Sequence, residues 1–401
     1  MPPPRAAPSG QVNGHEPHVR SLDGLRGICA LLVLLHHIVL TQPDFASFEW
    51  NEATRPHGIF EWAMFETPLR IFWSGQDRAI LFFVLSGFVL SLPWLRFHPK
   101  PYGTFLLNRF CRLYPPYLIA MTLAATGAFC LGGRHIPGAG IWFDQLGWSP
   151  PLSWRALPSV LFLLNDKSSD WLNESVWSLV WEARVVLIFP LLIWPIARWK
   201  NAGVLGVFIA LAAVHPLLAR VLPPHLAAPF AAAGTALLYP AYFILGAAVA
   251  LNQDAIRVHL SRKRGMAGLA VLTLGLAMFW VRWPVQNGRA DGLAAALVMA
   301  AALGCPVLAN ALTAKPLLWL GRLSYSLYLI HVPVILTIII LCHGKVPLLA
   351  CLVAPAICIA AAALFRRAVE VPSARLTLQL VHPARATGLG KSPQPHEAVH
   401  G

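Results

Sequence analysis

The chain has 401 residues, of which 57% are hydrophobic and 12% charged, and its mean hydropathy is +0.61. This composition excludes a soluble domain of the same length and is typical of an integral membrane protein. The formal net charge of +14 would suit a nucleic-acid partner. However, the cations and acids fall in alternating loops, as the positive-inside rule expects. We therefore expect a membrane protein with no nucleic-acid partner.

Ten apolar segments are each long enough for a bilayer crossing, which takes about 20 helical residues. In chain order they are residues 25–42, 78–95, 113–132, 175–195, 202–221, 233–251, 266–283, 290–311, 320–341 and 346–364. Pro355 is expected to interrupt the last of them. Because the basic loops alternate with acidic or neutral ones, the sequence predicts an all-α integral membrane fold. We expect ten transmembrane helices, with both termini in the cytoplasm.

The two ends of the chain differ from this apolar middle. Residues 1–20 are polar and rich in proline and show no cleavable signal, so a disordered cytoplasmic tail is expected there. A single ten-helix membrane domain is expected over residues 21–373, followed by a second disordered cytoplasmic tail over 374–401. Seven cysteines without C-x-x-C spacing predict packing residues and no disulfide framework or metal site.

The first apolar segment carries two ionisable residues eleven positions apart, Arg26 and His37. Eleven residues turn a helix by a net ~20° and advance it ~16.5 Å, so both side chains share one face. Asp23 lies three residues before Arg26 and can orient it, whereas His36 points ~100° away. Ionisable residues at this depth are usually functional. The alternative is that Arg26 snorkels as a topological anchor and His37 is a satisfied core histidine.

A second basic pair, Arg109 and Arg112, comes just before the third segment, whose entry Pro115 and Pro116 are expected to mark. Both arginines are predicted at the inner boundary, on the same side as Arg26. Guanidinium groups there would bind phosphates by bidentate hydrogen bonds. They would also serve as plain positive-inside anchors.

A carboxylate is predicted at the depth of His37. If the fourth segment enters from outside near Ser175, Glu182 lies about 10.5 Å below the outer boundary. A buried carboxylate there would hold the tautomer of His37 and stabilise its imidazolium form. The competing interpretation is a structural ion pair between Glu182 and Arg184.

The ninth segment carries a polar stripe at helical spacing, formed by Ser324, Tyr328 and His331. This stripe would line a path for the acyl group or its acceptor. Hydrogen bonding between packed helices explains it equally well.

Five blocks in a fixed order resemble the membrane-bound acyltransferase-3 family: LDGLRGICALLVLLHH, FFVLSGFVLS, FLLNRFCRLYPPYL, NESVWSLVWEARVVLIFP and LGRLSYSLYLIHVP. A terminal FRRAVEVP is similar to the closing acidic-proline segment of the family, so the resemblance spans roughly residues 21–373. One departure follows Glu182, where many relatives carry a second acid or Gln and this chain has Ala183 and Arg184. Longer members also carry a fused extracytoplasmic hydrolase-like domain, which we do not expect here.

The resemblance implies an O-acyltransferase that moves an acyl group, commonly acetyl, from cytoplasmic acyl-CoA to a hydroxyl of a cell-surface or lipid-linked carbohydrate. Acyl-CoA would be a co-substrate, with no bound cofactor or metal, in a multi-pass protein of the bacterial inner membrane. The catalytic residues would be His37 and Glu182. The donor would be bound by Arg26, Arg109, Arg112 and Asp23. Candidate pocket residues are Ser86, Trp177, Ser178, Tyr328 and His331.

Two alternatives stay open at this point. Ser86 and its neighbour Gly87 also fit close helix packing without any substrate contact. For the whole chain, the alternative is a proton-coupled transporter or flippase of a lipid-linked saccharide, with His37 and Glu182 as a proton relay. Such transporters usually show inverted halves or paired broken helices, and the sequence has no internal repeat.

Overall fold

The computed structural model describes residues 19–50, 58–72, 75–96, 99, 101–133, 136–137, 140–148, 157–163, 171–221, 236–262, 265–281, 288–343 and 348–381. Every regular element in this part of the chain is helical, as the sequence predicts. The predicted N-terminal tail lies outside the described residues up to position 18, and so does the C-terminal tail beyond position 381.

The first half of the chain forms four long helices and several short ones. They are α1 (Arg20–Val39), α2 (Pro43–Trp50), α3 (Ile59–Glu66), η1 (Pro68–Phe72), α4 (Gly75–Leu95), α5 (Tyr102–Leu131), α6 (Gly140–Leu146), α7 (Leu157–Phe162), η3 (Glu174–Val176) and α9 (Trp177–Trp199). Helix α5 begins well before the predicted start at 113, and Pro115 and Pro116 lie inside it rather than at its entry. Membrane helices tolerate such prolines where neighbouring groups satisfy the freed carbonyls.

The second half continues the bundle to the end of the described chain. Its elements are α10 (Asn201–Val221), α12 (Leu238–Leu251), α13 (Gln253–Leu260), α14 (Met266–Trp280), α15 (Gly288–Gly304), α16 (Pro306–Leu312), α17 (Lys315–Leu341), α18 (Leu348–Phe365), the π-helical η7 (Arg366–Glu370) and α19 (Val371–Val381).

Six of the described helices are long and apolar enough to cross a membrane. They are Arg20–Val39, Arg78–Leu95, Tyr102–Leu131, Glu174–Trp199, Lys315–Leu341 and Ala350–Leu376. A seventh candidate is the broken pair Ala290–Gly304 and Pro306–Leu312, bent by 91°. Three shorter apolar helices are Asn201–Val214, Leu238–Leu251 and Met266–Trp280. Each predicted segment thus overlaps one helix or broken pair, while ten full crossings and the orientation of the termini stay predictions.

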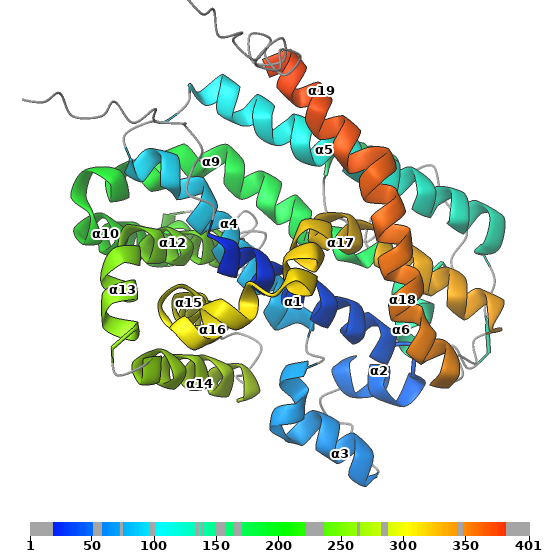
Figure 1. Cartoon of the computed structure of the whole chain (residues 1–401). Helices are drawn as coiled ribbons and strands as arrows, with labels where there is room; N and C mark the ends of the chain where they lie inside the picture. The colour runs from blue at the N-terminus through cyan, green and yellow to red at the C-terminus, as the bar shows by residue number, and fades with distance from the viewer. Residues whose placement is uncertain are drawn as a thin grey trace, which may run out of the picture.

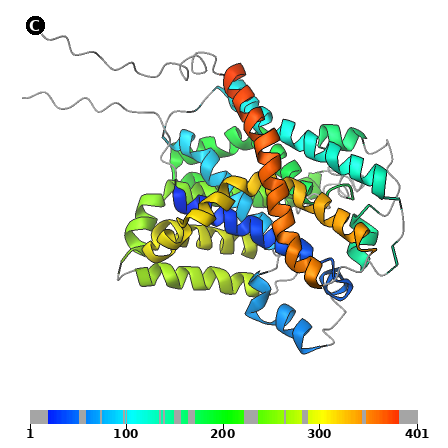
Figure 2. The same cartoon turned by 45° about the vertical axis from the view of Figure 1, so that its right-hand side comes forward.

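The end of the chain departs from the sequence-based expectation in two places. Pro355 lies inside α18 without interrupting it. Residues 374–381, predicted as the start of a disordered tail, are helical. Figure 2 shows α18, η7 and α19 following one another as a single long column. The apolar run Ala350–Leu376 extends across all three elements, which favours helix over disorder in this stretch.

Helices α1 and α17 pack closely against each other in the middle of the bundle (Figure 1). Three glycines allow this approach, because a side chain at any of them would meet the opposing backbone. A Cβ atom on Gly321 would collide with the carbonyl of Asp23, and one on Gly27 would meet the carbonyl of Leu317. Gly24 similarly faces the carbonyl of Leu312 at the end of α16. The contact places His37 of α1 beside α17.

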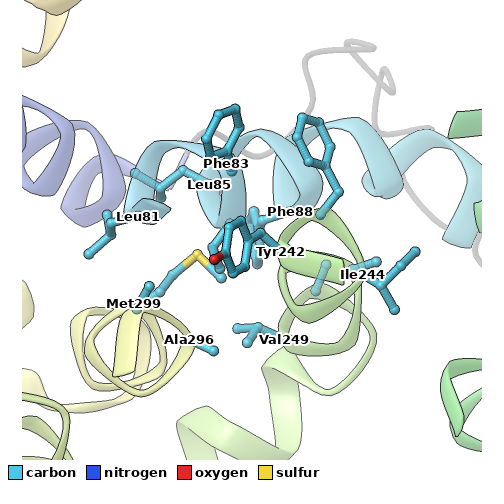
Figure 3. Packing of buried hydrophobic residues seen from close by; sticks show 14 of the residues in the cluster. Leu81, Phe83, Leu85, Phe88, Tyr242, Ile244, Val249, Ala296 and Met299 are labelled. Atoms are coloured by element: carbon cyan, nitrogen blue, oxygen red, sulfur yellow. The ribbon is translucent and has the colours of Figure 1, made fainter. Parts of the chain in front are cut away.

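A second packed layer joins α4, α12 and α15. Figure 3 shows Phe83, Tyr242 and Met299 meeting there, and the rings of Phe83 and Tyr242 stack with centroids 6.2 Å apart. Gly87 lies against the backbone of Phe243, as the packing interpretation of this glycine predicts. This layer supports the face of α4 that is turned away from the candidate site.

Candidate active site

Two buried histidines from different helices meet in the bundle, His37 on α1 and His331 on α17. The Nε2 atom of His331 lies 3.2 Å from Nδ1 of His37, and the two side chains are among the buried polar groups, at 7% and 1% exposure. The close packing of α1 on α17 causes this contact between residues that are nearly 300 positions apart in sequence.

Backbone hydrogen bonds fix which nitrogen of each histidine carries the proton. Nδ1 of His37 lies 2.9 Å from the carbonyl oxygen of Val33, and Nδ1 of His331 lies 2.9 Å from that of Leu327. A carbonyl oxygen only accepts, so we assign the proton to Nδ1 in each neutral ring. The one Nδ1–H of His37 is then shared between the carbonyl of Val33 and Nε2 of His331, and Nε2 of His37 is the basic nitrogen of the neutral ring.

The second ring nitrogen of His37, Nε2, faces a carboxylate that the sequence analysis did not select. Oε2 of Glu174 lies 3.6 Å from Nε2 of His37, and the indole N–H of Trp142 donates to the same oxygen at 2.6 Å. Glu174 belongs to the 3₁₀ turn η3, just before α9.

The chain around Glu174 is fastened to α17 by its two neighbours. The side-chain amide of Asn173 donates to the carbonyl of Leu329 at 2.8 Å, and the hydroxyl of Ser175 donates to the carbonyl of Tyr328 at 2.9 Å. Both residues are buried. These two bonds, which we call the η3 clamp, set the position of the carboxylate beside His37.

The predicted partner of His37, Glu182, lies elsewhere. It accepts a hydrogen bond from the hydroxyl of Ser86 at 3.1 Å, two helical turns along α9 from Glu174. The guanidinium of Arg184 lies 4.7 Å from the ring centroid of Trp181. The depth argument treated Glu174 as part of an outer loop, whereas the η3 clamp draws it inward to the histidine.

His36 lies closer to the site than its rotation along the helix suggests. It lies at 7% exposure, with its ring centroid 5.1 Å from that of His37, and both rings border one cavity. The expected 100° rotation is present along α1, but the start of α4 closes over that side: a Cβ atom on Gly75 would meet the His36 ring. His36 therefore belongs to the site's surroundings.

Three adjoining cavities run past these residues. The histidine cavity has about 830 Å³ of empty volume and is lined by Val33, His36, His37, Leu40, Gly75, Ala79, Glu174, Ser175, Trp177 and Tyr328. The central cavity has about 890 Å³ and is lined by Arg26, Phe82, Leu85, Ser86, Val89, Arg109, Arg112, Leu113, Ser178, Leu179, Glu182, Ser324, Tyr325, Tyr328 and Leu329.

The third, the arginine cavity, has about 1120 Å³ of empty volume and lies around the N-terminal part of α1. Its lining includes five arginines, Arg20, Arg26, Arg112, Arg322 and Arg366, and two acids, Asp23 and Glu370. It shares Arg26, Arg112, Ser324 and Tyr325 with the central cavity. Each predicted donor-binding residue thus borders one of these two cavities, with Arg109 in the central one.

Three of the cavity arginines, Arg20, Arg322 and Arg366, were not selected in the sequence analysis. The structure brings them together because η7 folds against α17. Nε of Arg366 donates to the carbonyl of Arg322 at 3.0 Å, and the hydroxyl of Ser326 donates to Glu370 at 2.5 Å. A π-helical turn such as η7 often marks a functional site. Among the described residues, no group of three or more His, Cys, Asp or Glu side chains could hold a metal ion.

Comparison with known proteins identifies the family of the chain. The acyltransferase-3 family, described as an acyltransferase domain, matches residues 19–366. The chain belongs to this family. It is 29% identical over 343 residues to acyltransferase MdmB of Streptomyces mycarofaciens, which covers 79% of this chain and 78% of that protein. It is also 26% identical over 100 residues to acyltransferase clz18 of Cochliobolus lunatus, about 21% of each chain. No solved structure matches the chain. The protein is thus a helical acyltransferase-family protein of a membrane.

Proposed function

We propose that this protein is an O-acyltransferase that moves an acyl group, acetyl in the first instance, from acyl-CoA to a hydroxyl of a carbohydrate or lipid-linked acceptor. The observation that supports it most is the pairing of His37 Nε2 with Glu174 in a cavity that adjoins an arginine-lined space through a shared central cavity.

The donor would bind at the arginine end. Coenzyme A carries several phosphates, and guanidinium groups bind phosphates through charge-assisted, often bidentate hydrogen bonds. Five arginines against two acids leave the arginine cavity with a formal charge of +3, from +5 and −2. Arg26 and Arg112 border both this cavity and the central one, so they would hold the donor where its thiol arm enters the bundle.

The chemistry would take place in the histidine cavity. Nε2 of His37 takes the proton of the acceptor hydroxyl as its oxygen attacks the thioester carbonyl carbon. The new C–O bond forms, the C–S bond breaks, and the departing thiolate receives the proton. Glu174 stabilises the intermediate imidazolium, and His331 holds the ring by accepting from Nδ1. In a second route, Nε2 attacks the thioester carbonyl and the C–S bond breaks to release the thiolate; the acceptor hydroxyl then attacks the acyl-histidine, the N–C bond breaks, and the hydroxyl proton passes to the thiolate.

The cellular setting follows from the same proposal. The donor side would be cytoplasmic and the protein would lie in the bacterial inner membrane. The long match to a Streptomyces acyltransferase supports a bacterial setting. Acyl-CoA would serve as co-substrate with no bound cofactor. Trp177, which lines the histidine cavity, would suit stacking on a sugar ring of the acceptor.

The transporter alternative has one structural feature in its favour, the 91° break between Ala290–Gly304 and Pro306–Leu312. Broken helices often form the binding sites of transporters. In the described structure, however, α16 borders none of the three cavities and its end packs on Gly24 of α1. The break therefore supports helix packing at α1, and the acyltransferase proposal explains more of the site.

The proposal predicts different kinetic defects at the two ends of α1. Purified protein in detergent should release CoA slowly from acetyl-CoA without an acceptor. The Arg26→Ala variant should mainly raise KM for acetyl-CoA, by roughly 10- to 150-fold, the value of a charge-assisted bond. The His37→Ala variant should lower kcat by about 10²- to 10⁴-fold, because the base is lost. The rate of CoA thiol release at varied acetyl-CoA concentration measures KM and kcat for both variants.

His259→Ala is the matched control. Nδ1 of His259 lies 2.7 Å from the carbonyl of Ala255 on α13, so this histidine has the same kind of backbone bond outside the site. Its loss should leave kcat unchanged. Normal turnover by folded His37→Ala protein would contradict the proposal, and so would an absence of CoA release with every acyl-CoA tested. Mass spectrometry of surface polysaccharide from a deletion strain and its parent would then identify the acceptor.

A further inference from the structure

One lining residue is common to the histidine cavity and the central cavity, Tyr328 of α17. On α4, Ala79 borders the histidine cavity and Phe82 the central one. On α9, Trp177 borders the histidine cavity and the next residue, Ser178, borders the central cavity. Tyr328 therefore lies at the level where the two spaces meet.

Side chains from two other helices hold the Tyr328 ring at this level. Its hydroxyl is 2.7 Å from the hydroxyl of Ser178, and Phe82 packs edge-on against its ring with centroids 5.8 Å apart. On the other side the ring centroid of His331 is 5.9 Å away. Helices α4, α9 and α17 thus each contribute to a constriction between the donor side and the histidines.

The space on the donor side of this constriction is largely apolar. Leu85, Leu179 and Leu329 line the central cavity next to Tyr328, and such a lining accepts a thiol arm or acyl chain. The thioester carbonyl carbon must nevertheless reach Nε2 of His37 on the far side. An acyl group that reaches His37 from the central cavity must pass Tyr328 and Phe82, so each additional methylene would compete with these side chains for space.

We propose that Tyr328, held by Ser178 and Phe82, is a specificity-determining residue that limits the donor to short acyl chains. This inference rests on the proposed function and adds the donor class to it. One methylene in a close-fitting apolar pocket changes kcat/KM by about 10- to 200-fold. A side chain at the junction of the two cavities therefore selects chain length sharply.

The test compares acetyl-, butyryl- and hexanoyl-CoA as donors for the purified full-length protein, with release of the CoA thiol as the readout. The wild-type protein should prefer acetyl-CoA. Tyr328→Val removes the ring and should lower the ratio of kcat/KM for acetyl- over hexanoyl-CoA by about 10-fold or more. Tyr328→Phe keeps the ring and should keep most of the preference. Ser178→Leu adds volume from α9 and should lower the use of butyryl-CoA relative to acetyl-CoA by about 10-fold.

Tyr114→Val is the matched control. The Tyr114 hydroxyl is likewise held by a hydrogen bond, which it donates to the carbonyl of Leu161 at 2.7 Å, but this residue borders none of the three cavities. Its variant should keep the wild-type preference. An unchanged preference in folded Tyr328→Val protein, or wild-type protein that favours long chains, overturns this inference alone. If Tyr328→Val fails to fold, the butyryl-CoA to acetyl-CoA ratio of Ser178→Leu tests the inference instead, and an unchanged ratio overturns it. Absence of thiol release from any donor by wild-type protein overturns the proposed function and this inference together.

Discussion

At the scale of single residues, the site depends on how the backbone holds an imidazole. His37 and His331 each direct Nδ1 at the carbonyl four residues earlier, a bond that α-helical geometry offers inside one helix. The carboxylate in this site therefore does not have to fix the tautomer of His37, because the Val33 carbonyl already does. We infer that Glu174 acts on the charged form of the ring, since it lies near Nε2 and not near Nδ1.

Two glutamates near the N-terminal end of α9 give a direct test of this assignment. Glu174→Gln removes the charge beside His37 and should lower kcat by about 10²-fold, at the low end of general acid–base catalysis. Glu182→Gln removes a charge from the central cavity, next to the arginines, and should change KM for acyl-CoA more than kcat. Steady-state kinetics with acetyl-CoA separates these effects.

The same substitution at both positions controls for the loss of a buried charge in general. A larger fall in kcat for Glu182→Gln than for Glu174→Gln would restore the assignment made from the sequence. It would also mean that the distance between Glu174 and His37 has no catalytic meaning.

Part of the geometry of this candidate site follows from the sequence. The eleven-residue spacing places Arg26 and His37 on one helix, and a single helix has known rise and rotation. The carboxylate could not be found that way, because its position depends on the η3 clamp between segments more than 150 residues apart. The position of His36 beside the same cavity could not be predicted for a related reason. Rotation along one helix predicts the direction of a side chain but not which neighbouring helix packs against it.

At the scale of helices, the site depends on the distance between α1 and α17. Gly321 lies directly against the backbone of Asp23, so a side chain at this position must push the two helices apart. Gly321→Val should lower the free energy of unfolding by about 1–3 kcal/mol or more, the usual cost of overpacking. Denaturation of the purified protein in detergent measures this loss.

Gly206→Val is the matched control, because a Cβ atom at Gly206 of α10 would meet nothing within 4 Å. This variant should have nearly wild-type stability. Equal stability of the two variants would show that α1 and α17 are not in close contact.

Helix positions were predictable because long apolar runs have few alternatives in a bilayer. The ends of the helices were harder to predict. Pro115, Pro116 and Pro355 were each read as boundaries, yet they lie within α5 and α18. A proline removes one donor, and the surrounding bundle can satisfy the carbonyl that is left.

At the scale of the whole molecule, the three cavities follow α1 from its arginine end to its histidine end. A route of this kind requires the two ends of α1 to face opposite sides of the membrane. The positive-inside rule predicts that the arginine end faces the cytoplasm, the side where acyl-CoA is expected under the proposed function.

The number of crossings can be tested at the shorter helices. Reporters fused after Lys200 and Ser261 should be cytoplasmic, whereas a reporter after Arg220, at the end of α10, should be external. Alkaline phosphatase and fluorescent-protein fusions measure this. A cytoplasmic Arg220 reporter would show that α10 and α12 do not cross, and the ten-helix topology would be wrong.

The η3 clamp also affects the choice of host for producing this protein. Asn173, Glu174 and Ser175 form an N-x-S glycosylation sequon, but Asn173 is fully buried and its amide donates to Leu329. A sugar attached to that nitrogen has no room in the folded chain. In yeast or insect cells, any material with a glycan at Asn173 would therefore be misfolded. The glycan-free fraction would be the one to purify.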